Sequence, residues 1–166
     1  RSESLSSFGD NTLIVEEYIA NARHVEVQIL ADQHGNVMVL GDRDCSVQRR
    51  HQKIIEECPA FDLSDKLRAS LHTEAKNLAI SVNYSSCGTV EFLVLKDKHY
   101  FLEMNTRLQV EHTVTEEVYN IDLVEWQIRI AQNEKLPKEP FKPSGHAIQA
   151  RIYAEDPFNQ FMPSPG

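Results

Sequence analysis

Two carboxylates and an amide occupy matched positions in a segment that has the pattern of a β-hairpin. The strand-like runs Gly88–Leu95 and His99–Asn105 are separated by a loop of three residues. With that loop, Glu91 lies directly opposite Glu103, where Cβ atoms of paired strands are roughly 4.5–5.5 Å apart. Asn105 lies two residues further on and projects to the same face.

Two carboxylates held this close repel each other unless a cation lies between them. Carboxylate and amide oxygens suit a hard cation such as Mg²⁺ that also keeps bonds to substrate phosphates. The alternative is that Glu91 and Glu103 are ordinary solvated residues. Their neighbours Phe92, Leu93 and Phe101 suit a covered sheet better than a free one. From the residues alone, the metal site and the solvated face both stay open.

The next segment places a charged or amide side chain at every second position: Arg107, Gln109 and Glu111. If this segment is extended, the three side chains line one wall. An arginine beside a carboxylate can bind a planar anion and also offer a base. An ordinary surface ion pair between Arg107 and Glu111 is the competing interpretation.

Apolar patterns predict the elements that must position these residues. The predicted strands outside the hairpin cover residues 13–19, 24–30, 36–40 and 146–153. His34-Gly35 suits a turn between two of them, and Ser64 can cap a helix running to Val82. A second helix is predicted over 122–132. In the last strand the even positions are mostly apolar, so Arg151 faces the opposite side. Strands and helices in this mixed order predict an α+β fold with an antiparallel sheet.

Composition limits the classes of partner. The chain has 166 residues with 17 basic and 25 acidic side chains, a net charge of −8. This balance argues against nucleic acid or an anionic membrane surface as partner. The three cysteines form no C-x-x-C pair, so a reducing compartment is expected and Cys45 is interpreted as a packing residue. No apolar run approaches the roughly 18–20 residues of a membrane span, and no signal peptide is visible.

Four segments resemble the signature motifs of biotin carboxylases, which are ATP-grasp enzymes. They are Arg23–Glu26, Arg43–Lys53, Glu103–His112 and Ala150–Pro157. The resemblance runs from about Leu13 to Gly166. It implies the C-terminal part of an ATP-grasp fold, an antiparallel sheet flanked by helices, over residues 1–135. Residues 136–166 are expected to form a linker and the start of the biotin carboxylase C-terminal domain.

The implied activity is ATP-dependent carboxylation of biotin on a carrier protein, with bicarbonate as the carbon source and carboxyphosphate as intermediate. Glu16–Ile19 resembles the hinge whose backbone reads adenine, and Leu93 is placed to pack on that ring. Glu91, Glu103 and Asn105 match the ligands of Mg²⁺ (or Mn²⁺) that bridges the ATP phosphates. The residues implied for ATP binding are Glu16, Glu17, Tyr18, Ile19, His24, Gln48, His51, Leu93, Glu91 and Glu103.

The resemblance also assigns the reacting groups. The implied bicarbonate pocket consists of Lys53, Arg107, Gln109 and Val110. Arg107 can grip a planar oxyanion with two nitrogens, while Lys53 adds a point charge. Glu111 matches the general base. Arg151 matches the residue that holds the biotin ureido oxygen as it becomes enolate-like. The implied catalytic residues are therefore Arg107, Glu111, Lys53 and Arg151.

Three features depart from the family pattern. Lysine is frequent in relatives where Glu17 stands, and proline where Thr113 stands. The six glycines do not cluster, although ATP-grasp enzymes need a glycine-rich loop over the phosphates. We therefore expect the upstream glycine-rich lobe to be missing. A fragment of this kind is expected to be inactive alone and to bind nucleotide weakly.

Two other classes compete with this interpretation. One is another ATP-grasp ligase, such as a carboxylate–amine ligase or a carbamoyl-phosphate synthetase-like domain, which the motifs Arg43–Lys53 and Arg151–Pro157 disfavour. The other is a non-enzymatic binding or oligomerisation module.

Within the family, Asp122–Gln127 and Ala150–Pro157 look most like the biotin-carrying subunit of methylcrotonyl-CoA-type carboxylases. The resemblance implies a biotin carboxyl carrier, a carboxyltransferase component and a homodimer of the full-length enzyme. It implies neither nucleic acid nor membrane as partner. The expected location is the cytoplasm, or the mitochondrial matrix in a eukaryote.

Overall fold

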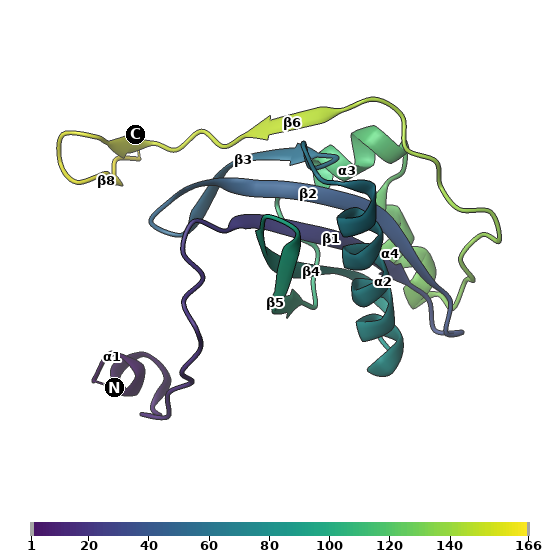
Figure 1. Ribbon diagram of the computed structural model, residues 1–166, viewed down its shortest axis with the longest axis horizontal. Helices are drawn as coiled ribbons and strands as arrows, with labels where there is room; N and C mark the ends of the chain where they lie inside the picture. The colour runs from purple at the N-terminus through teal and green to yellow at the C-terminus, as the bar shows by residue number, and fades with distance from the viewer. Residues whose placement is uncertain (1, 166) are drawn as a thin grey trace.

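A computed structural model describes residues 2–165, and a six-stranded antiparallel sheet forms its centre (Figure 1). The strands are β1 (Arg23–Ala31), β2 (Val37–Arg49), β3 (Gln52–Cys58), β4 (Ser86–Leu95), β5 (Lys98–Asn105) and β6 (Ala147–Ala150). Their order across the sheet is β5-β4-β1-β2-β3-β6. A separate two-stranded hairpin pairs β7 (Glu155–Asp156) with β8 (Met162–Pro163). The predicted α+β class with an antiparallel sheet is confirmed.

The central strand β1 has one apolar face and one polar face, and both are buried. Its odd-numbered residues from Val25 to Ala31 pack in a core against α2 (Asp65–Ser81). Because successive side chains alternate, Glu26 and Gln28 point to the opposite face, where their exposure is 0% and 1%. An antiparallel sheet normally leaves its polar face to water. Here that face carries the charged groups of the candidate site.

Helix α2 forms where the sequence predicts a helix. The Ser64 hydroxyl accepts a hydrogen bond from the Leu67 backbone N–H, as an N-cap residue should. Leu67, Leu71, Ala75 and Ala79 recur at three and four residues and are buried against the sheet. Burying a side chain as large as Leu71 contributes about 1.5–3 kcal/mol. The predicted range of 64–82 includes both capping residues, Ser64 and Val82.

Two shorter helices cover part of the other face. Helix α3 (His112–Tyr119) packs Val114 and Val118 on Cys58 of β3. Helix α4 (Leu123–Ala131) belongs to a core that includes Leu30 and Cys87. The Asp122 side chain caps α4 by accepting from the Glu125 N–H, which confirms the predicted helix over 122–132. Together these helices leave one end of the polar face uncovered.

Two irregularities bend the sheet. Gly41 has a φ of +70°, and the pairing of β1 with β2 shifts between Val27 and Ile29. A Cβ on Gly41 would lie 2.7 Å from the Tyr119 hydroxyl oxygen, so the position also needs glycine for space. The hairpin between β2 and β3 turns through Arg50 and His51, which both have positive φ.

The β4–β5 hairpin corrects the predicted register. Leu95 pairs with Lys98 across a two-residue turn, whereas the sequence predicted Leu95 opposite His99 across three residues. The pairing then shifts between Glu91 and Phe92, leaving Leu102 as an extra residue on β5. This bulge restores Glu91 opposite Glu103. The predicted pairing of Glu91 with Glu103 is thus confirmed, but it results from a two-residue turn and a bulge and not from a three-residue loop.

One predicted strand is wrong, and another is shorter than predicted. Residues 13–19 form no strand and are exposed, with Ile14 at 88% and Val15 at 93%. The strand predicted over 146–153 is reduced to β6, and its apolar positions face outward, with Ile148 at 64% and Ile152 at 97% exposure. The reason is the same in both cases: in the described residues no layer covers these apolar side chains.

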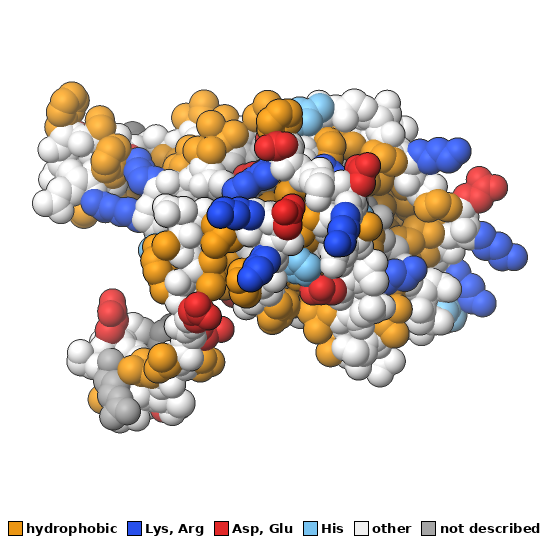
Figure 2. Space-filling view, in the orientation of Figure 1, with side chains coloured by type: hydrophobic (Ala, Val, Ile, Leu, Met, Phe, Trp, Pro, Cys, Tyr) orange, Lys and Arg blue, Asp and Glu red, His pale blue; other side chains and the backbone are white. Residues whose placement is uncertain are grey.

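The terminal segments extend away from the sheet (Figure 1). Both lie on the left of the view: helix α1 (Ser2–Phe8) and the following residues below the sheet, and the β7–β8 hairpin beyond β6 at the top. Figure 2 shows hydrophobic side chains gathered on the surface of this C-terminal segment. Arg49 links the segment to β2 through an ion pair with Glu155 and a cation–π contact of 4.1 Å with the Phe161 ring. Within residues 2–165, no helix is both long and apolar enough to span a membrane.

Candidate active site

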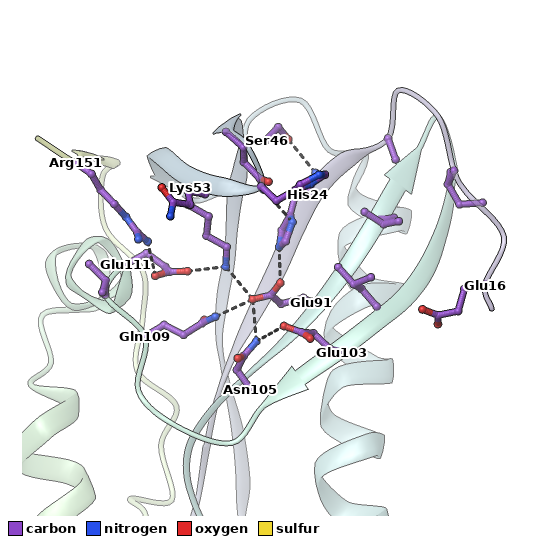
Figure 3. A pocket seen from close by; sticks show the side chains of 18 of the residues that line it. Glu16, His24, Ser46, Lys53, Glu91, Glu103, Asn105, Gln109, Glu111 and Arg151 are labelled. Carbon is purple, nitrogen blue, oxygen red and sulfur yellow. Dashed lines mark hydrogen bonds and ion pairs between the residues drawn. The ribbon is translucent and has the colours of Figure 1, made fainter. Parts of the chain in front are cut away.

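A cleft of about 900 Å³ opens at the uncovered end of the polar face. Its walls come from the exposed segment before β1, the β2–β3 hairpin, the β4–β5 hairpin, the loop before α3 and the segment after β6 (Figure 3). Every residue that the sequence predicted for the site lines this cleft: Glu16, Glu17, Tyr18, Ile19, His24, Gln48, His51, Lys53, Glu91, Leu93, Glu103, Asn105, Arg107, Gln109, Val110, Glu111 and Arg151. The structure shows that these residues line the cleft, and their individual roles stay predictions.

Lys53 is the centre of the cleft floor. Its Nζ donates to Glu26 Oε2 at 2.6 Å, to Glu91 Oε1 at 2.8 Å and to Glu111 Oε1 at 2.6 Å. An ammonium has three N–H donors, so all three are taken by carboxylates. Burial alone would lower the pKa of Lys53. The negative charge of Glu26 and the hydrogen bonds to Glu111 and Glu26 outweigh burial, so the pKa lies well above the ordinary value for lysine. Lys53 is therefore a permanent cation.

The neighbouring carboxylates are held ionised. Burial raises the pKa of Glu91, while hydrogen bonds from His24 and Lys53 outweigh burial and bring it to about 2. Burial also acts against Glu111, whose pKa nevertheless falls below its usual range because Lys53 donates to it. Both groups carry a negative charge at neutral pH.

Arg151 contacts two carboxylates from the far side of the cleft. Its Nη2 donates to Glu111 Oε2 at 2.9 Å, and its Nε donates to Glu56 Oε1 at 2.6 Å. The side chain thus faces the cleft, away from Ile148 and Ile152, as the alternation in the sequence predicted. Burial raises the pKa of Glu56, and the Arg151 charge opposes that shift.

The predicted metal ligands converge at one edge of the cleft. The Asn105 amide nitrogen lies 3.0 Å from Glu91 Oε1 and 3.0 Å from Glu103 Oε1 (Figure 3). Rotating that amide by 180° places its oxygen beside both carboxylates, and the two orientations fill the same space. With Glu103 included, five carboxylates share three permanent cations, so a divalent ion would balance the remaining two charges. The five are Glu26, Glu56, Glu91, Glu103 and Glu111, and the three are Arg43, Lys53 and Arg151. The residues therefore fit a hard divalent cation.

Groups of three close ligand atoms occur elsewhere on the floor, within residues 2–165. One consists of His24, Glu26 and Glu91, and the other of Glu26, Cys45 and Glu111. Both surround the Lys53 ammonium or lie against it, so a cation already neutralises them. Cys45 is fully buried and burial raises the pKa of its thiol, which agrees with the interpretation of Cys45 as a packing residue.

The other residues predicted for nucleotide binding lie beside this edge of the cleft. His24 Nε2 is 2.7 Å from Glu91 Oε2, and its Nδ1 is 3.1 Å from the Gln48 amide nitrogen. Leu93 shares a face of β4 with Glu91 and offers an apolar surface to the cleft. His51 lies at the tip of the β2–β3 hairpin with a φ of +63°, a conformation that non-glycine residues rarely adopt.

The segment from Arg107 to Glu111 is a loop and not the extended wall considered from the sequence. Gln109 and Glu111 are 6% and 2% exposed, and the Gln109 amide donates to Glu91 Oε1 at 2.7 Å. Arg107 is exposed, and its recorded contact is with the Leu108 carbonyl, so it does not pair with Glu111. The surface ion pair considered as an alternative is therefore wrong.

Comparisons with known proteins agree with this geometry. Residues 1–139 match a family model described as "Carbamoyl-phosphate synthase L chain, ATP binding domain". The chain belongs to this family of ATP-binding domains. Among curated relatives, the ATP-binding domain described here is 56% identical over 99% of its length to the mitochondrial methylcrotonoyl-CoA carboxylase subunit alpha of Arabidopsis thaliana. It is 50% identical over 99% of its length to the mitochondrial pyruvate carboxylase of Rattus norvegicus.

Solved biotin carboxylases share the fold. One from Campylobacter jejuni, described as a complex with "beta-gamma-ATP", superposes on 99% of this ATP-binding domain with a TM-score of 0.94 and 52% identity. The biotin carboxylase domain of the Hydrogenobacter thermophilus 2-oxoglutarate carboxylase, solved as a dimer with MgADP, ADP and bicarbonate, covers 98% with a TM-score of 0.92 and 44% identity. The resemblance to biotin carboxylases and the ATP-grasp fold predicted from the motifs are both confirmed.

The chain spans only part of these relatives. It covers 23% of the Arabidopsis subunit, 14% of the rat pyruvate carboxylase and 37% of the Campylobacter structure. The activity, substrates and partners of a whole enzyme are therefore matters for proposal.

Sequence reasoning missed three charged residues of this ATP-binding domain. Arg43 is fully buried and donates to Glu26, Gln28 and Thr115 at 2.6–2.8 Å, with longer bonds to Thr89 and Gln109. Glu26 links that arginine to Lys53, and Glu56 holds Arg151. Glu26 and Arg43 stand inside quoted motifs, and strict alternation on β1 placed Glu26 opposite the apolar core. That signal was available but was not used to assign a role.

Proposed function

We propose that this chain forms the ATP-, metal- and bicarbonate-handling part of a biotin carboxylase, the enzyme that carboxylates biotin on a carrier protein at the expense of ATP. The observation that carries the proposal is the chain of contacts Lys53–Glu111–Arg151 on the cleft floor. It places a cation for an oxyanion and a second cation each within hydrogen-bond distance of the same carboxylate base. Acyl transfer through a mixed anhydride and proton removal from a weak N–H acid need this set of groups.

The first step uses the Lys53 side of the cleft. Bicarbonate bound at Lys53 replaces one of its three carboxylate partners, since no N–H donor is left over. Exposed Arg107 can close on the same anion with two nitrogens. Glu111 accepts the bicarbonate proton as the bicarbonate oxygen attacks the γ-phosphorus of ATP, and ADP leaves. Once Lys53 turns to the anion, Glu111 loses the hydrogen bond that depresses its pKa and becomes a stronger base.

The second step uses the Arg151 side. Carboxyphosphate breaks down to CO₂ and phosphate, the phosphate takes the proton from biotin N1, and the deprotonated N1 attacks CO₂. The ureido oxygen then gains negative charge, and the Arg151 guanidinium lies where it can stabilise that charge. Glu91, Glu103 and Asn105 would hold Mg²⁺ (or Mn²⁺), which neutralises phosphate charge when bound. The nucleotide would be bound by the backbone of residues 16–19 and by the side chains of His24, Gln48, His51 and Leu93.

The test is ATP-dependent carboxylation of free biotin by the full-length protein that carries this sequence. Arg151→Ala and Glu111→Ala should each lower kcat/KM by at least about 10²-fold, because each removes a charge used in the transition state. Arg129→Ala is the matched control, since Arg129 is a partly exposed arginine of α4 that contacts Glu125 and the Trp126 ring and does not line the cleft. Biotin carboxylation that survives both site substitutions would refute the assigned roles.

Another ATP-grasp ligase is the alternative, and the carbamoyl-phosphate synthase description of the matched family favours keeping it. A carbamoyl-phosphate synthetase-like domain also activates bicarbonate with ATP but passes it to an amine. The same protein should then form product with ammonia and leave biotin unchanged. Carboxylated biotin as the product decides for the first proposal.

The remaining expectations follow from the proposal. The whole enzyme would work with a biotin carboxyl carrier and a carboxyltransferase component, and as a homodimer. Its final acceptor is proposed to be an acyl-CoA of the methylcrotonyl type, supported by the 56% identity to such a subunit. Residues 1–135 would belong to the ATP-grasp domain and 136–166 to a linker and the start of the next domain. The compartment would be the cytoplasm, or the mitochondrial matrix as for the named plant and animal relatives. The 166-residue chain alone is expected to be inactive.

A further inference from the structure

Glu56 is a fully buried carboxylate next to the cleft that the mechanism above does not use. It lies in the middle of β3, where its backbone pairs with Gln149 of β6, and its side chain is 0% exposed. Oε1 accepts the 2.6 Å hydrogen bond from Arg151 Nε. Oε2 is buried and has no hydrogen-bond partner in the part of the chain that the structure describes. A buried carboxylate with one unsatisfied oxygen costs about 1–3 kcal/mol, so its retention needs a reason.

The two carboxylates that hold Arg151 have different surroundings. Glu111 lines the cleft and also accepts from Lys53, so it faces the reacting groups. Glu56 does not line the cleft. Glu111 can therefore contact the reacting groups, whereas Glu56 is buried behind Arg151 and cannot.

Arg151 needs an anchor because its backbone is weakly held. The residue follows the last position of β6, and residues 151–154 have no regular secondary structure. The backbone contact recorded for it is a 2.9 Å hydrogen bond from its N–H to the Ile54 carbonyl. A long arginine side chain loses about 2 kcal/mol of rotamer freedom when fixed, so its orientation depends on its ion pairs.

We infer that Glu56 is a positioning residue that keeps the Arg151 guanidinium in the cleft while Glu111 changes charge, an inference that rests on the proposed function. When Glu111 accepts a proton from bicarbonate, its ion pair with Arg151 loses the Coulomb attraction. Glu56 takes no proton in that step and keeps Nε in place. Nη2 is then released from Glu111 and becomes available to the ureido oxygen of biotin. Glu56 therefore acts on the biotin step and not on the formation of carboxyphosphate.

This assignment predicts a split between two activities of the full-length protein. Glu56→Gln should lower kcat/KM for free biotin by at least about tenfold, mainly through a higher KM, because the neutral amide holds the guanidinium less firmly. Bicarbonate-dependent ATP hydrolysis without biotin should change by less than about threefold in the same variant. Glu56→Asp keeps the charge but is one methylene shorter, so it should fall between Glu56→Gln and wild type in the biotin assay.

The matched control is Glu57→Gln on the same strand. Glu57 points to the other face, accepts from the Phe61 N–H at 3.3 Å and does not line the cleft. Both activities should stay at the wild-type level. The melting temperature of every variant, measured without ligands, reports any loss of folding.

The outcomes separate this inference from the proposed function. A wild-type protein that does not carboxylate biotin refutes the function, and the role of Glu56 with it. An active wild type whose two activities fall in parallel in Glu56→Gln assigns Glu56 a structural role only and overturns the inference. An unchanged biotin KM also overturns it. If Glu56→Gln does not fold, the same ratio measured in Glu56→Asp decides.

Discussion

The floor of the cleft and the two segments that flank it hold their side chains in opposite ways. The floor comprises Glu26, Arg43, Lys53, Glu91 and Glu111, charged groups that are buried or nearly so and bonded to one another. The flanks, residues 9–22 and 151–165, contain apolar side chains that are open to solvent. Ile14, Val15 and Ile152 are 88%, 93% and 97% exposed.

The difference shows that burial follows from partners and not from side-chain type. The polar face around Glu26 is buried because β2 and β3 supply the opposite charges of Arg43 and Lys53 to Glu26. The loop before α3 adds the Gln109 amide, which donates to Glu91 beside it. Strand-like apolar patterns at 13–19 and 148–152 find no such complementary layer in the described residues. The hydrophobic effect favours burial only where another apolar surface is present.

The largest expected effect comes from removing the arginine that joins the floor together. Arg43→Ala should lower the free energy of unfolding by about 4 kcal/mol, because Glu26 keeps a buried charge with one partner fewer. Denaturant unfolding measures the change. Arg129→Ala removes only a partly exposed ion pair with Glu125 and a cation–π contact with the Trp126 ring, so it should cost no more than about 1 kcal/mol. Equal losses in the two variants would remove the contrast between floor and surface.

A second prediction compares the stability effect of a substitution in the apolar core beneath the sheet with one in the exposed segment 9–22. Leu71 is fully buried on α2, and Leu71→Ala should cost about 3 kcal/mol through lost burial and a residual cavity. Ile14→Ala removes a similar apolar side chain at 88% exposure and should change stability by less than about 0.5 kcal/mol. Thermal unfolding of both variants tests this. A large loss in Ile14→Ala would show that the flank is packed in solution.

The smallest effect concerns pH. Asp32 accepts hydrogen bonds from the backbone N–H groups of His34, Asn36 and Leu136 and from the Asn36 amide. Burial alone would raise the pKa of Asp32, but these hydrogen bonds, led by the Asn36 side chain, lower it from 3.8 to about 2. A depressed folded-state pKa stabilises the protein above the unfolded value and loses that contribution as pH falls from about 4 to about 2.

Asp32→Asn should therefore cost roughly 2 kcal/mol at pH 7, and the difference from wild type should shrink toward pH 2. Urea unfolding at several pH values measures it. Asp97→Asn in the exposed β4–β5 turn is the control and should show no such dependence. A constant difference across this range would mean that the charge of Asp32 is not what stabilises the turn.

Much of the fold could be predicted from local pattern. β1, the two hairpins, α2 and α4 follow from alternation, turn residues and the caps Ser64 and Asp122. α3 was missed because its eight residues follow a motif that was considered extended. β3 was missed because Gln52 and Lys53 were considered only as the end of a motif, and no element was predicted for residues 54–58.

The residues of the site were easier to name than their contacts. Glu91 opposite Glu103 was predicted correctly, yet the loop length behind that prediction was wrong and a bulge corrects it. Glu56 could not be assigned from sequence, because its contact with Arg151 joins positions 95 residues apart. Contacts of that range depend on how β6 pairs with β3, which no local pattern specifies.

The bulge at Leu102 has a consequence for how molecules of this protein meet. Within residues 2–165, β5 is an edge strand of the sheet, and a long straight edge offers unpaired N–H and C=O groups to any other strand. The extra residue twists β5 and interrupts that row halfway along the strand, while Lys98 places a charge at its start. The irregularity that aligns Glu103 with Glu91 thereby also protects the edge against β-aggregation.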